Sequence, residues 1–183
     1  MNSYWIAAIV SLWLLTTVVG VAQLGLLSKV APLLSDGHSH GPIELQDGLA
    51  VGQPAGEFAA VDRTGAIVGL DALRGHPTVV LFLSAGCQPC QRLAAELRAS
   101  GDPWSPGSLV VITNHDDRIN LPDWVIVLRQ HDMSAAAAFG TYATPHAFAL
   151  DEATTVTAKT VPVSVAHLKE LAHTATGQPA PAP

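Results

Sequence analysis

The chain has 183 residues, of which 49% are hydrophobic and only 13% charged, so it is more apolar than an ordinary soluble domain. Its formal net charge of −6 argues against a nucleic-acid-binding protein, which needs clustered Lys and Arg to neutralise phosphates. Its two cysteines are too few for a disulfide scaffold or a four-cysteine zinc site. We therefore expect the cysteines to act as one pair.

The apolar excess is concentrated at the N-terminus, where residues 1–28 contain no Asp, Glu, Lys or Arg. The apolar run of residues 4–27 is long enough to cross the hydrocarbon core of a bilayer, roughly 30 Å, as a helix. A cleaved signal peptide is the alternative, but such peptides have an apolar segment of roughly 7–15 residues after a basic one. The sequence therefore predicts a transmembrane anchor over residues 1–28.

The rest of the chain divides into a tether, one domain and a tail. Residues 29–48 mix Pro, Gly, Ser and Asp without periodicity, which is typical of a flexible linker. Residues 177–183 are rich in Pro and Ala and are expected to be disordered. Residues 49–176 are enough for one domain with a single core.

Within residues 49–176 the pattern alternates between short strands and helices. β-Branched and aromatic runs predict strands, and apolar residues at helical spacing predict helices. Such alternation predicts the α/β class. The expected strands are residues 58–61, 66–70, 78–83, 109–112 and 147–150, and the expected helices are residues 89–99, 135–139 and 165–174.

The cysteines form a Cys87-Gln88-Pro89-Cys90 motif that follows a buried strand and opens a helix. A helix N-terminus has unpaired N–H groups and a positive dipole end, so it should stabilise a Cys87 thiolate and lower the pKa of this thiol. Pro89 is compatible with the first helical turn, where it costs no hydrogen bond. Cys90 lies one turn further in and should resolve a mixed disulfide formed at Cys87.

The cysteine pair has two other possible interpretations, a structural disulfide and a metal site. A structural disulfide across so short a loop would constrain the unfolded chain little. A metal site would need more ligands, and His38 and His40 lie in the predicted tether without a fixed geometry. A redox-inert copper-binding or metallochaperone module remains the alternative function, although the motif itself predicts no resident metal and no cofactor.

Residues 52–90, GQPAGEFAAVDRTGAIVGLDALRGHPTVVLFLSAGCQPC, resemble the membrane-anchored thioredoxin-like proteins of the TlpA/ResA type. The resemblance extends over residues 48–174. Its less specific features, including Phe-Leu-Ser before the cysteines, are most similar to the MauD type, which acts in methylamine dehydrogenase maturation. It implies a thioredoxin fold, an α/β architecture with a mixed central sheet and helices on both faces. It also implies that Pro145 is a cis-proline beside the cysteines and that Thr144 offers its backbone to a bound substrate.

The resemblance and the cysteine motif together predict a membrane-tethered thiol–disulfide oxidoreductase. Its domain would lie outside the cytoplasm, held at the cell membrane by a single helix. Cys87 would exchange disulfides with cysteine-containing protein substrates, and a membrane redox partner would recycle the pair. The direction of exchange stays open, because Gln88 is uncharged and Leu81 stands where thioredoxin has a buried Asp.

Three further residues are candidates for a catalytic or substrate-binding role near the cysteines. His146 follows the predicted cis-proline and could lower the pKa of the Cys87 thiol, but strand alternation turns it away if Pro145 faces the cysteines. We therefore favour a surface or hydrogen-bonded histidine. Trp104 and Trp124 are expected to pack at loop edges, although either could line a substrate groove.

Overall fold

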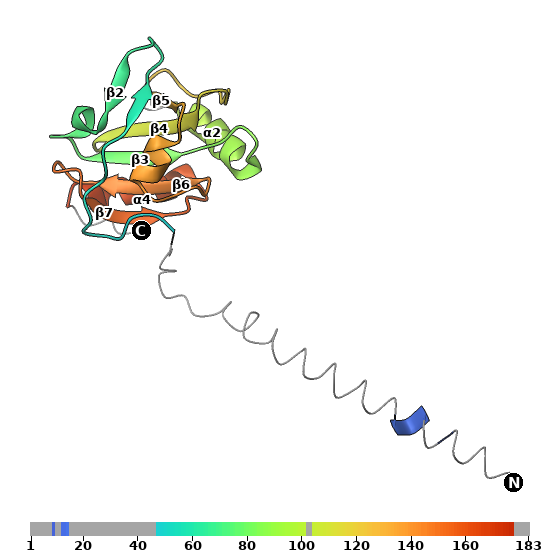
Figure 1. Cartoon of the computed structure of the whole chain (residues 1–183). Helices are drawn as coiled ribbons and strands as arrows, with labels where there is room; N and C mark the ends of the chain where they lie inside the picture. Colours follow the sequence, from blue (N-terminus) through green and yellow to red (C-terminus); the bar gives the residue numbers. More distant parts are fainter. Residues whose placement is uncertain (1–8, 10–11, 15–46, 102–103, 178–183) are drawn as a thin grey trace, which may run out of the picture. The chain divides into compact units, whose positions relative to one another are not determined.

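The structure is a computed structural model of the whole chain, and it describes residues 9, 12–14, 47–101 and 104–177 (Figure 1). The predicted anchor, tether and tail lie outside these residues apart from positions 9, 12–14, 47, 48 and 177. Residues 9 and 12–14 are helical. Within the described part of the chain, no helix is long and apolar enough to cross a membrane.

The described domain is built on one seven-stranded sheet with the order β2-β1-β5-β4-β3-β6-β7 (Figure 1). The β3–β4 and β4–β5 pairs are parallel, whereas the other neighbours are antiparallel. The sheet is therefore mixed, as expected. The strands are β1 (Ala59–Val61), β2 (Ile67–Gly69), β3 (Thr78–Phe82), β4 (Ser108–Asn114), β5 (Ile126–Gln130), β6 (His146–Leu150) and β7 (Val156–Thr160).

Strand β3 lies inside the sheet, and all five of its residues are buried. Successive strand residues point to opposite faces, so Val79 and Leu81 join one core cluster while Val80 and Phe82 join the other. This two-sided burial explains why the β3 sequence is continuously apolar instead of alternating.

Helices cover both faces of the sheet. Helix α2 (Gln88–Ser100) and helix α4 (Val165–Ala175) pack on the face that contains Val79 and Leu81. The short helix α3 (Ser134–Ala138) and the 3-10 turn η2 (Leu70–Leu73) cover the opposite face. This arrangement confirms the mixed sheet with helices on both faces.

The α3 face of the sheet contains an aromatic cluster. The ring centroid of Phe139 lies 5.1 Å from that of Phe148, 5.4 Å from that of Phe82 and 6.2 Å from that of Phe58. All four rings are buried. Tilted and edge-on packing of this kind stabilises a core beyond the area that it buries.

The structure adds three elements that the sequence analysis did not predict, namely β5, β7 and η2. In β5 buried and exposed residues do not alternate regularly, because the neighbours Val127 and Leu128 are both buried. Strand β7 lies at the edge of the sheet, is only partly buried and contains Thr and Lys. Neither strand therefore has a clear strand pattern in its sequence. The five predicted strands and three predicted helices are present, with ends shifted by one or two residues.

Candidate functional site

The cysteine motif lies where β3 leads into α2. Cys87 is the N-cap of α2, and its sulfur accepts a hydrogen bond from the backbone N–H of Cys90 at 3.2 Å. Gln88 and Pro89 are exposed and form the start of the first turn, where proline costs no helical hydrogen bond. The helix therefore directs the Cys90 backbone N–H and its positive dipole end at the Cys87 sulfur.

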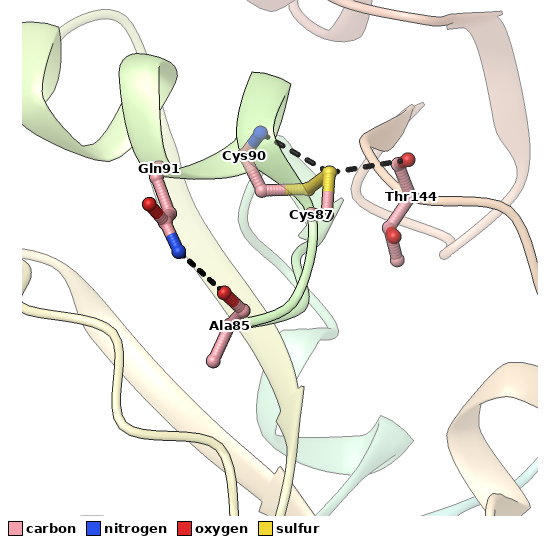
Figure 2. Close-up of a disulfide and its surroundings, with 5 residues drawn as sticks. All are labelled: Ala85, Cys87, Cys90, Gln91 and Thr144. Atoms are coloured by element: carbon pink, nitrogen blue, oxygen red, sulfur yellow. Dashed lines mark hydrogen bonds between the residues drawn. A yellow bond between two sulfur atoms is a disulfide. The ribbon is translucent and has the colours of Figure 1, made fainter.

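The two cysteines are joined by a disulfide with a Cα–Cα distance of 5.2 Å (Figure 2). Cys90 has no exposed surface, whereas Cys87 is half-buried. A second molecule can therefore approach Cys87 but not Cys90. The difference in exposure is the one expected from the sequence, whereas the attacking role of Cys87 and the resolving role of Cys90 stay predictions.

The segment before β6 lies against the disulfide, although it is 57 residues away in the sequence. The Thr144–Pro145 peptide bond is cis, which confirms the expectation drawn from the resemblance. The carbonyl oxygen of Thr144 lies 3.4 Å from the sulfur of Cys87 (Figure 2). In the reduced pair the Cys87 thiol can donate a hydrogen bond to this oxygen.

Gln91 contributes to the site and was missed by the sequence analysis. Its side-chain amide donates a hydrogen bond of 2.6 Å to the carbonyl of Ala85, in the loop that leads into Cys87 (Figure 2). This bond ties the first turn of α2 to the loop before it. The position of Gln91 directly after Cys90 is the only sequence feature that points to a role in the site. The hydrogen bond itself could not be predicted, because it depends on how the loop at Ala85 folds.

The surroundings of the cysteines are apolar. Leu81, at the position where thioredoxin has an Asp, is fully buried in the same cluster as Cys90. Trp104 and Trp124 are partly buried and pack against this cluster, as does Cys87. The two tryptophans therefore belong to the packing on the α2 face.

His146 lies on the opposite face of the sheet from Cys90. It shares that face with Phe148, and the centroids of the two rings are 4.5 Å apart. The prediction from strand alternation is confirmed. Of the two expected alternatives, a surface or a hydrogen-bonded histidine, the structure has the second, because His146 has no exposed surface and its ring bonds to Thr141.

A short hydrogen-bond chain holds the His146 ring. The Thr141 hydroxyl donates to the carboxylate of Asp47 at 3.0 Å and lies 2.6 Å from Nδ1 of His146. Because a hydroxyl has one proton to donate, a Thr141 hydroxyl that donates to Asp47 accepts from Nδ1, and Nε2 then carries no proton in the neutral ring. Nε2 is buried, and none of the described residues bonds to it.

The charge state of His146 follows from this environment. Burial lowers the pKa of His146 below its ordinary value of 6.5. The nearby carboxylate of Asp47 raises this pKa, and the ammonium of Lys159 lowers it, but burial is the largest of the three causes. His146 is therefore neutral near pH 7 and is not placed to act on the cysteines.

Metal ligands do not gather in the described part of the domain: no group of three or more His, Cys, Asp or Glu side chains is placed to hold an ion there. His38 and His40 lie outside the described residues.

Comparisons with known proteins were made on both sequence and structure. No protein-family model matches the chain, and no curated protein sequence matches it. Solved structures do match. A putative thiol:disulfide interchange protein DsbE from Chlorobium tepidum is 18% identical with a TM-score of 0.52, covering 70% of this chain and 97% of its own.

Two further solved structures agree with the first. MTB DsbF, determined in its mixed oxidized and reduced forms, is 21% identical with a TM-score of 0.53, covering 64% of this chain and 94% of its own. A putative protein disulfide isomerase from Bacteroides thetaiotaomicron is 14% identical with a TM-score of 0.53, covering 71% and 90%. The domain has a thioredoxin-like fold. At these identities the likeness establishes the fold, and the function has to be argued from the site.

Proposed function

We propose that the protein is a thiol–disulfide oxidoreductase that acts on protein substrates through Cys87 and Cys90. The observation that carries this proposal is the asymmetry of the pair. Cys87 is partly exposed at the N-terminus of α2 and its sulfur lies beside the Thr144 carbonyl, while Cys90 is fully buried. A structural disulfide needs no such arrangement.

The chemistry in the reducing direction has two steps. The Cys87 thiolate attacks a substrate disulfide, so that a Cys87–substrate bond forms, the substrate bond breaks and one substrate sulfur leaves as a thiolate. Cys90 then attacks the Cys87 sulfur, which forms the Cys87–Cys90 disulfide and releases the second substrate sulfur with the Cys90 proton. Two electrons pass to the substrate, and the reverse sequence oxidises a substrate dithiol.

Mixed-disulfide trapping tests this function. The full chain carrying Cys90→Ser should accumulate disulfide-linked complexes with protein substrates, because the resolving thiol is missing. These complexes should disappear on reduction and should not form in Cys87→Ser or in the double variant. Absence of trapping by Cys90→Ser under both oxidising and reducing conditions contradicts the proposal.

We also propose that residues 1–28 anchor the protein in the cell membrane and that residues 29–48 tether the domain on the extracytoplasmic side. The charge-free apolar run supports the anchor. A membrane redox partner would recycle the dithiol there, as expected for a TlpA/ResA-like or MauD-like protein.

Labelling in intact cells tests the proposed location. A membrane-impermeant maleimide should label Cys87 in the Cys90→Ser variant without cell lysis, and the protein should remain in the membrane fraction after a high-salt wash. Labelling that requires lysis contradicts an extracytoplasmic domain.

A Cu(I) titration addresses the alternative of a copper-binding module, which predicts one-to-one binding that is lost when either cysteine is replaced.

A further inference from the structure

A short loop, residues 141–145, carries Thr144 and Pro145 to the disulfide. It connects the turn that follows α3 to β6 and contains no helix or strand of its own. The carbonyl oxygen of Thr144 is its group that lies beside the cysteines, 3.4 Å from the Cys87 sulfur (Figure 2). Because no regular element fixes this loop, its position depends on the contacts at its two ends. We call it the cysteine-facing loop.

A buried hydrogen bond joins the two ends of the cysteine-facing loop. The hydroxyl of Thr141, its first residue, lies 2.6 Å from Nδ1 of His146, which directly follows its last residue. Thr141 is 1% exposed and His146 is fully buried. The backbone N–H of Thr141 also donates to the carbonyl of Ala136 in α3 at 2.9 Å, and His146 pairs with Phe82 of β3. The bond therefore closes the loop at its base, between α3 and the sheet.

Asp47 holds this hydrogen bond from the N-terminal side of the domain. Its carboxylate accepts a bond from the Thr141 hydroxyl at 3.0 Å. A hydroxyl has one proton, so donation to Asp47 leaves Thr141 to accept from His146. Lys159 fixes this segment in turn, because its ammonium donates to the carbonyls of Asp47 and Gly48 at 3.1 and 3.2 Å. Asp47, Thr141 and His146 form one connected group, which we call the loop network.

The Thr144 carbonyl affects the chemistry of reduced Cys87. A Cys87 thiol can donate a hydrogen bond to this oxygen, which favours the thiol. A thiolate cannot donate, and the carbonyl oxygen, as the negative end of its dipole, disfavours it. The Cys90 N–H, 3.2 Å from the same sulfur, favours the thiolate instead. Since only the thiolate attacks a disulfide, the reactivity of Cys87 depends on how firmly the loop holds the Thr144 oxygen in place.

We propose that the loop network positions the Thr144 carbonyl beside Cys87 and thereby lowers the fraction of this cysteine that is present as thiolate. Within the described residues, no hydrogen bond joins Asp47, Thr141 or His146 to either cysteine, so the three act through the loop as positioning residues. The inference rests on the proposed function, because it concerns the step in which Cys87 attacks a substrate disulfide. It gives a buried histidine on the opposite face of the sheet from Cys90 a part in setting the rate of this step.

Reaction with glutathione disulfide across a range of pH tests the loop network. The Cys87 thiolate of full-length Cys90→Ser attacks one sulfur of the probe, so that a Cys87–glutathione bond forms and the other glutathione leaves as a thiolate. Mass spectrometry follows this product over time. The rate at each pH, divided by the rate on the alkaline plateau, gives the thiolate fraction. A change in access to the sulfur alters the rates at every pH alike and leaves this ratio unchanged.

Thr141→Val, made in the Cys90→Ser chain, removes the hydroxyl and keeps the branched shape of the side chain. Below the midpoint of the pH profile, the thiolate fraction should rise about threefold, which corresponds to the loss of one weak neutral hydrogen bond to the thiol. Thr141→Ser keeps the hydroxyl and should retain the parent profile. Thr113→Val is the matched control, because it also removes a buried threonine hydroxyl, but one without a hydrogen-bond partner among the described residues.

His146→Leu removes the other half of the same hydrogen bond and should give a similar rise. The double variant Thr141→Val/His146→Leu should exceed the larger single effect only slightly, because both changes break one bond. Independent, additive effects would contradict the network.

Two further results are decisive, and they are distinguishable. An unchanged pH profile in Thr141→Val or in His146→Leu, or an equal rise in Thr113→Val, would refute the loop network and leave the proposed function standing. No mixed disulfide with glutathione disulfide at any pH, in the parent Cys90→Ser chain as well as in its variants, would refute the proposed function itself. Since the two variants break the bond from its two sides, either one that folds decides the matter.

Discussion

Replacement of His146 by Leu should remove part of the acid sensitivity of the fold. In the native domain the imidazole is buried and neutral, with Nδ1 donating to Thr141 and Nε2 unpartnered among the described residues. Asp47 and Lys159 are the charged groups that act on it, and burial outweighs both in lowering its pKa. In the unfolded chain the same ring is solvated and takes up a proton near pH 6.5.

The direction and size of the effect follow from this difference. A lowered native pKa means that the contribution of His146 to stability is complete above about pH 6.5 and is lost as the pH falls through the native pKa. Protonation of the solvated ring in the unfolded chain, with its ordinary pKa near 6.5, limits the loss of unfolding free energy between pH 7.5 and 5.5 to about 1.4 kcal/mol. A higher native pKa makes this loss smaller.

Urea unfolding of the full chain at pH 7.5 and 5.5, followed by circular dichroism, measures this loss. We expect His146→Leu to lose less stability on acidification than the unmodified protein, and His76→Gln, a change at an exposed histidine, to lose as much. The reasoning is refuted if His146→Leu and the unmodified protein lose the same stability between the two pH values.

Three more substitutions test the packing around this region. Phe139→Ala removes the ring between Phe82 and Phe148, and urea unfolding should show a loss of about 3–5 kcal/mol; a loss below about 1 kcal/mol contradicts the aromatic core. Gly48→Ala should cost more than about 1 kcal/mol, because Gly48 has a φ of 82° and a Cβ would lie 2.6 Å from Phe148. Lys159→Met loses two hydrogen bonds to the carbonyls of Asp47 and Gly48, so the amides of residues 48 and 49 should exchange faster with solvent; unchanged exchange contradicts this contact.

The parts of the fold that could be predicted are those whose signal is local. The continuous apolar run of β3 and the apolar spacing of α2 reflect burial on two faces and on one face, respectively. The edge strand β7 could not be predicted because its Thr and Lys residues are only partly buried and its pairing with β6 is a tertiary feature. The same holds for β5, which contains Arg129 and Gln130.

In the site, too, the features with a local sequence signal could be predicted and those that depend on the tertiary fold could not. The order of Cys87 and Cys90 along a helix start predicts which sulfur is reachable, and the structure has this asymmetry. The cis bond before Pro145 was expected from the resemblance and not from the residues alone. The buried state of His146 depends on Thr141 and on Asp47, which lies 99 positions earlier in the chain, so strand alternation gave its face but not its surroundings.

The cavity of about 160 Å³ at the carboxyl ends of β3, β4 and β5 could not be predicted for the same physical reason. Its walls come from the ends of three strands and from the segment before Pro145, and each wall residue has an ordinary local role. Ile112 and Phe82, for example, are core residues of their strands whose side chains also reach the cavity. Only the folded sheet brings these surfaces together beside the disulfide.

The central claim is that Cys87 and Cys90 form a redox-active pair and not a structural bond. Equilibration of the full chain with glutathione buffers of graded ratio, followed by alkylation and mass spectrometry, measures this directly. We predict reversible two-electron behaviour with a midpoint between about −270 and −120 mV, the range of known dithiol catalysts. A disulfide that stays closed until well below about −300 mV, as structural disulfides do, would contradict the account.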